Sequence, residues 1–164
     1  MRAWLGLSAL ALAAGVFQAA VLGRIAGFLP LNLLLVLAVL VGLQREFLSG
    51  AAMVVGLGYL QDLFTGDIPG LHMTAWLLVF FLAQVSRERF SPERPGTQFM
   101  LGLFLCVAEL ALVVILSRFF SEPLPLDPRM LAITGIAVLI ESVMVALFFP
   151  LSARLLAPEL LSRR

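Results

Sequence analysis

The sequence predicts an all-α integral membrane protein, a compact bundle of six transmembrane helices, or of five if one apolar segment does not cross. Of its 164 residues, 62% are hydrophobic and 13% are charged, with a mean hydropathy of +1.07. A chain this apolar cannot cover its surface with polar groups in water. Its charges separate continuous apolar runs of about 20 residues, enough to cross a ~30 Å hydrocarbon core. Continuous runs favour helices, because membrane β-strands alternate in polarity.

The apolar runs predict a single transmembrane domain over residues 1–164. We expect its spans at about 3–22, 25–43, 47–62, 69–85, 98–117 and 130–152. The first run resembles a signal peptide but is long for one, and no convincing cleavage site follows, so we expect an uncleaved span. Pro30 and Asn32 predict that the second helix is broken or starts late. The third span is the shortest of the six.

The arginines predict the orientation of the bundle. With six spans, three arginines fall on one side (Arg24, Arg118 and Arg129) and eight on the other (Arg2, Arg45, Arg87, Arg89, Arg94, Arg154, Arg163 and Arg164). Cytoplasmic loops carry the excess of basic residues. We therefore expect a multi-pass protein with both termini and the loop 86–98 in the cytoplasm, and with the hairpin from Asp62 to Gly70 outside.

Two acids lie inside predicted spans. Glu109 is in the middle of the fifth span and Glu141 is in the middle of the sixth, so in antiparallel helices they could meet near the membrane midplane. An acid at that depth is costly and faces protein or a water-filled cavity. Three interpretations stay open: a proton or ion relay, a ligand site, or a protonated or hydrogen-bonded acid that joins helices or pairs with a partner's span.

A second set of polar residues is expected near the outer face of the membrane: Gln18, Arg24, Asn32, Asp62, Asp67 and His72. Asp62 could pair with Arg24. Asp67 and His72 would suggest a metal site, but one histidine with carboxylates at loop spacing is a weak signal, and an interfacial polar cluster is the simpler interpretation. Gly70, with Gly66 and Pro69, supplies a tight turn.

Small residues recur every four positions on the first span, at Ala11, Gly15, Ala19 and Gly23, with an offset pair at Ala9 and Ala13. Ala52 and Gly56 repeat the spacing on the third span. Such spacing lets helix backbones approach closely in lipid. Packing within the bundle and docking of another membrane subunit both remain open.

Motifs of enzymes and nucleotide sites are missing from the sequence. It has no glycine-rich phosphate loop, no HExxH and no GxSxG, and Cys106 is its only cysteine. No basic, aromatic-rich patch favours nucleic acid. We therefore expect a non-enzymatic protein without a cofactor or a metal.

The run YLQDLFTGDIPGLHMTAWLLVFFLAQ, residues 59–84, resembles the signature region of the rod shape-determining protein MreD family. In that pattern an apolar span ends in Asp-Leu, a short Gly/Pro turn follows, and a glycine opens the next span. The matching positions are Asp62, Leu63, Gly66, Pro69, Gly70 and the small residue Thr74 or Ala75. Length, number of spans and the short charged C-terminal tail also fit this family.

The resemblance implies a scaffold or regulatory subunit of the bacterial cell-wall elongation complex in the cytoplasmic (inner) membrane, with a role in cell shape. Its partners would be an MreC-like protein, and beyond it a RodA-like glycosyltransferase, a class B penicillin-binding protein, an MreB-like filament and membrane lipids. The fold would be similar to the substrate-binding subunits of energy-coupling-factor transporters.

That similarity supplies the alternative, a substrate-binding subunit of a vitamin transporter. Ala9 and Ala13 would then match the small motif that docks the coupling subunit. Such a subunit needs an outward pocket lined by polar and aromatic groups. This chain has one tyrosine, Tyr59, and two tryptophans, Trp4 and Trp76, so it is poor in them.

Overall fold

The computed structural model describes residues 31–66, 68–90, 94–119 and 127–156, together with the single residues Ala13 and Gln18. Several expected features lie outside these residues: most of the span 3–22, the first part of the span 25–43, and the residues Ala9, Ala11, Gly15, Ala19, Gly23, Arg24 and Asp67. Beyond Ser152, only the backbone of the last helix is described.

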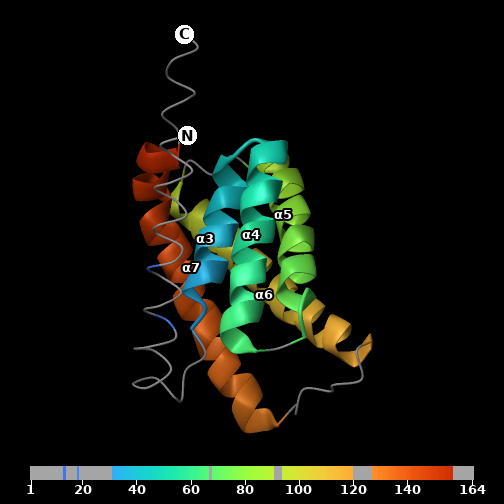
Figure 1. Cartoon of the computed structure of the whole chain (residues 1–164). Coiled ribbons are helices and arrows are strands. Elements are labelled where there is room, and N and C mark those ends of the chain that lie inside the picture. Colours follow the sequence, from blue (N-terminus) through green and yellow to red (C-terminus); the bar gives the residue numbers. More distant parts are fainter. Residues whose placement is uncertain are drawn as a thin grey trace.

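In the described ranges all regular secondary structure is helical. The five helices are α3 (Leu33–Gln44), α4 (Phe47–Thr65), α5 (Leu71–Arg89), α6 (Pro95–Phe119) and α7 (Pro128–Leu156) (Figure 1). Helix α3 begins late, at Leu33, where Asn32 caps it by accepting a hydrogen bond from the Leu35 backbone N–H. Helix α4 runs to Thr65, so the span expected to be the shortest has 19 residues.

Helix α3 forms the centre of the bundle. Nine of its twelve residues are buried, and it packs against α4, α5 and α7. A helix that is apolar on all sides is typical of a protein core or of a membrane span. The largest buried side chains around it are Trp76 and Phe80 of α5.

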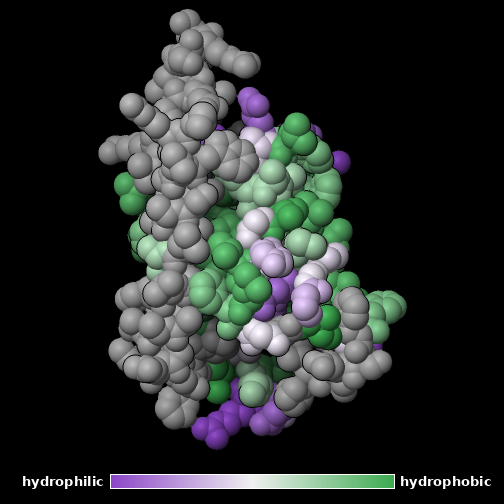
Figure 2. Space-filling model, viewed as in Figure 1, coloured by the Kyte–Doolittle hydropathy of each residue, from purple (hydrophilic) through white to green (hydrophobic). Residues whose placement is uncertain are grey.

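Three of the described helices are long and apolar enough to cross a membrane: α4, α6 and the Pro128–Ser152 part of α7. Their outward side chains are large and apolar, among them Leu48, Met100 and Leu147. The face in Figure 2 is largely hydrophobic, with hydrophilic residues at its ends and a small group between α4 and α5. This distribution suits a protein whose surroundings are lipid rather than water.

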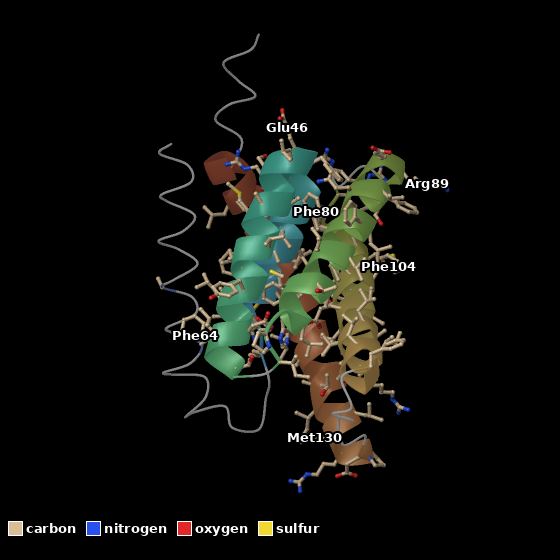
Figure 3. All side chains as sticks on the ribbon, turned by 45° about the vertical axis from the view of Figure 1, so that its right-hand side comes forward. Glu46, Phe64, Phe80, Arg89, Phe104 and Met130 are labelled. Atoms are coloured by element: carbon tan, nitrogen blue, oxygen red, sulfur yellow. The ribbon has the colours of Figure 1, made fainter. Side chains whose placement is uncertain are left out.

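Glycines set how closely the helices approach. A Cβ on Gly58 of α4 would lie 2.5 Å from the Met73 Cα of α5. On Gly102 of α6 it would lie 3.1 Å from the Val145 Cβ of α7. Phe80 lies between α4 and α5 (Figure 3), in a space that a side chain at Gly50 would fill. Close approach through small residues is the main packing device of helices in lipid.

The helices do not start at one level. In Figures 1 and 3, α7 begins well beyond the level at which α4 ends, and Met130 near its start lies farther out than Phe64. The turn between α4 and α5 is therefore set back from the start of α7. This stagger brings the N-terminus of α5 toward the middle of its longer neighbours α6 and α7.

Candidate functional site

Asp62, near the end of α4, closes the N-terminus of α5. Its Oδ2 accepts hydrogen bonds from the backbone N–H of Gly70 at 2.8 Å and of Met73 at 3.5 Å, and its Oδ1 accepts one from the His72 N–H at 2.9 Å. These N–H groups have no partner inside α5, and Gly70 has no side chain to cap them. The carboxylate also lies at the positive end of the α5 dipole.

The glycines of the turn make this contact possible. Gly66 has φ 69°, and its N–H donates to the Asp62 carbonyl at 3.1 Å, which ends α4. Gly70 has φ 95° and opens α5. Both conformations strongly favour glycine. The residues that carry the MreD resemblance thus have a physical role: they fold the chain back so that Asp62 meets the next helix.

His72 extends this contact into the bundle. Its Nδ1 lies 3.1 Å from the Asp62 Oδ1, and both residues are buried. The imidazole meets the edge of the Trp76 ring, one turn along α5, with 6.1 Å between ring centroids. One turn of helix therefore carries two polar rings on its buried face.

Trp76 connects this turn to Glu109, the acid in the middle of α6. Its indole Nε1–H donates to the Glu109 Oε1 of α6 at 3.1 Å, and His72 lies close enough to Glu109 for an electrostatic interaction. From the sequence, the outer polar residues and the two acids of the fifth and sixth spans were expected to form two separate sets. The stagger of the helices joins them, because it places the start of α5 beside the middle of α6. The four-residue spacing of His72 and Trp76 was the signal that could have revealed the link.

Glu141 of α7 caps the N-terminus of α3, as Asp62 caps the N-terminus of α5. Its Oε1 accepts a hydrogen bond from the Asn32 backbone N–H at 2.6 Å. Gln18 Oε1 accepts the Leu33 N–H at 2.9 Å. With the Leu35 N–H bound by Asn32 Oδ1 at 3.1 Å, three of the free donors at this helix end have partners. Gln18 also reaches Gln61 of α4, at 3.5 Å.

The acids of α6 and α7 lie near each other in the bundle. Glu109 is within electrostatic range of Glu141, and the buried Cys106 is within range of both. Glu141 is buried and Glu109 is partly buried. We call the connected set of Asn32, Asp62, His72, Trp76, Glu109 and Glu141 the polar network.

The hydrogen bonds of the polar network join helices. In the described part of the chain, no group of three or more His, Cys, Asp or Glu side chains could hold a metal ion. The pairing of Asp67 with His72 falls outside this test, since Asp67 lies outside the described residues. Each carboxylate instead accepts its hydrogen bonds from a backbone helix terminus or an aromatic ring.

A second set of polar contacts, at the opposite end of the bundle, was not identified from the sequence. Gln84 of α5 donates to the carbonyls of Gly42 and Arg45, both at 3.0 Å, and Arg87 donates to the Arg45 carbonyl at 3.1 Å. Gln44 donates to the Phe149 carbonyl at 3.1 Å, next to Pro150 in α7. These side chains bind carbonyls near the C-terminus of α3 and in α7, and their place near the ends of apolar runs was the available signal.

The small pair on α4 faces outward. Ala52 and Gly56 are exposed, and a Cβ on Gly56 would meet nothing within 4 Å. Packing between the described helices uses other glycines instead, Gly42, Gly58 and Gly102. Ala52 and Gly56 therefore form a strip on the surface of α4 from which no large side chain projects; we call it the strip on α4.

No protein-family model, no curated protein and no solved structure matches the chain.

Proposed function

We propose that this chain is a non-enzymatic scaffold or regulatory subunit of the MreD type, which holds an MreC-like partner in the bacterial cell-wall elongation complex and so helps to control cell shape. The observation that carries the proposal is the capping of α5 by Asp62. The residues of the resemblance, Asp62, Gly66 and Gly70, serve to fix α4 against α5. A rigid helix pair of this kind suits a protein that presents surfaces to partners.

The proposal includes a topology. Six transmembrane helices cross the bacterial inner membrane, both termini lie in the cytoplasm, and the fold is similar to that of energy-coupling-factor substrate-binding subunits. Three apolar helices of membrane length and the large apolar side chains on their outer faces support a membrane location. The clustering of Arg87, Arg89 and Arg94 at one end supports the orientation.

The proposed contact with the partner uses α4. Ala52 and Gly56 form an open strip there, and Tyr59 is exposed one turn farther along the same face. A transmembrane helix of an MreC-like protein could approach this strip closely. RodA-like, penicillin-binding and MreB-like proteins would join through that partner.

The experiment is purification of the tagged protein from its native membrane in mild detergent, with identification of the bound proteins by mass spectrometry. The variant Gly56→Leu fills the strip on α4, and Gly135→Leu on α7 is its matched control. A Cβ at either glycine meets nothing within 4 Å, so both variants keep the packing of the described helices. We expect Gly56→Leu to lower recovery of the MreC-like protein at least fivefold, and Gly135→Leu to leave it unchanged.

The outcomes separate the candidate functions. An MreC-like protein recovered with the parent chain supports the scaffold. An ATPase pair with a coupling subunit would overturn it and make the chain a transporter's substrate-binding subunit. Equal recovery with both variants would keep the scaffold but remove α4 as the contact.

A further inference from the structure

A groove of about 910 Å³ lies between the end of α5 and the start of α6, away from the polar network. The residues that form it include Ser86, Phe90, Arg94, Thr97, Met100 and Phe104. Its volume is in the upper part of the range found for small-molecule sites, about 300–1,000 Å³. Figure 3 shows Arg89, at the end of α5, and Phe104, farther along α6, on the same side of the bundle.

The groove changes in polarity along the helix axis. Ser86, Arg94 and Thr97 lie at the helix ends, where α5 finishes and α6 begins. Met100 and Phe104 follow one and two turns into α6, and they are 70% and 52% exposed. A mostly apolar groove with a few polar groups at the helix ends matches an amphiphile that lies parallel to the helices.

Arginines outnumber acids in the sequence at the polar end, where residues 86–98 hold Arg87, Arg89 and Arg94 with Glu88 and Glu93. Arg94 is exposed and makes no ion pair with any residue in the ranges that the structure describes. Arg89 is exposed at the end of α5, with Glu88 as an acidic neighbour. Arg87 is already bound to the Arg45 carbonyl. The guanidinium of Arg94 is therefore available to a phosphate, which its planar donors bind well.

We propose that this groove binds one anionic phospholipid from the leaflet at this end of the bundle. Arg94 binds the phosphate, the hydroxyls of Ser86 and Thr97 lie beside the headgroup, and an acyl chain lies along Met100 and Phe104. The Arg94 charge selects an anionic headgroup over a zwitterionic one. This site does not depend on the proposed scaffold function.

The first test compares lipids and charge. The purified full chain is delipidated and titrated with dioleoyl phosphatidylglycerol or dioleoyl phosphatidylcholine, and bound lipid is counted by native mass spectrometry. We expect one phosphatidylglycerol to bind more tightly than the rest, and Arg94→Ala to weaken it about fivefold, the effect of about one surface arginine. Arg118→Ala, at the other end of α6, removes the same charge and should leave binding unchanged.

The second test blocks the groove without changing charge. Gly96 lies at the start of α6 within the groove, and a Cβ there meets nothing within 4 Å. Gly96→Leu should therefore displace the tight lipid, while Gly135→Leu, on an equally open position of α7, should not. Equal binding of the two lipids would overturn the proposal, and so would equal effects of Arg94→Ala and Arg118→Ala. Retention of the tight lipid by Gly96→Leu would also overturn it. So would a mass spectrum that shows a bound peptide in place of the lipid.

Discussion

Helices α3 and α5 both begin inside the bundle, and a carboxylate from another helix closes each N-terminus. For α5 the carboxylate is Asp62, eight residues before Gly70 across a tight turn. For α3 it is Glu141, 109 residues after Asn32. Asp62 meets three backbone N–H groups and an imidazole, whereas Glu141 meets one N–H and shares the task with Gln18 and Asn32. The local cap is concentrated in one residue, and the long-range cap is distributed over three.

The concentrated cap should be the costlier one to lose. Asp62→Ala leaves one buried and two partly buried N–H groups without their acceptor, and we expect a loss in unfolding free energy on the order of 3 kcal/mol. Asp62→Asn keeps one oxygen and should lose about half as much. SDS-induced unfolding in mixed micelles, followed by circular dichroism, measures both. An Asp62→Ala protein as stable as its parent would refute the capping role.

The distributed cap should tolerate loss better. Glu141→Ala removes one buried acceptor, and we expect a cost of about 2 kcal/mol in the same unfolding assay. Glu141→Gln keeps an acceptor for the Asn32 N–H, so it should stay within about 0.5 kcal/mol of the parent. The double variant Glu109→Gln with Glu141→Gln should also keep the fold and partner binding. Loss of function with assembly intact would instead favour a proton-linked role.

The distance between α4 and α5 offers a way to strain the Asp62 cap without touching it. A methyl group at Gly58 would press on the Met73 backbone, so Gly58→Ala should push the helices apart and cost roughly 1.5 kcal/mol. Gly56→Ala, half a turn away on the open face, should be neutral or slightly stabilising, because alanine favours helix. Equal stabilities of the two variants would contradict the close approach.

The smallest effect on stability should come from loss of the hydrogen bond between Trp76 of α5 and Glu109 of α6. Trp76→Phe keeps most of the buried ring but removes the donor to Glu109, and we expect a cost of about 1 kcal/mol. Combining Trp76→Phe with Glu109→Leu, which has no acceptor, should cost less than the sum of the two single changes, since each single change removes the same hydrogen bond. Strict additivity in this double-mutant cycle would mean that the bond contributes nothing.

The contrast between local and long-range caps also explains what the sequence could predict. Gly66, Pro69 and Gly70 mark a turn by their backbone preferences, and Asn32 marks a late helix start, so both features were expected. The partners of Asp62 and Glu141 were not, because an acceptor in an apolar run does not indicate which helix end it will meet. The bond from Trp76 to Glu109 depends on how far α5 is set back from α6, and helix length alone does not determine that stagger.

The late start of α3 has a consequence for the order in which the protein is built. A twelve-residue helix is about 18 Å long, too short to cross a ~30 Å hydrocarbon core alone. The Asn32 backbone N–H, at the start of this helix, has its acceptor on Glu141. Glu141 is added by the ribosome 109 residues after Asn32. A nascent chain that has not yet received α7 therefore carries a partly buried donor without an acceptor at the start of α3. Closure of the fold is tied to arrival of the last helix, so a product truncated before Glu141 would leave an incomplete core for quality-control proteases to recognise.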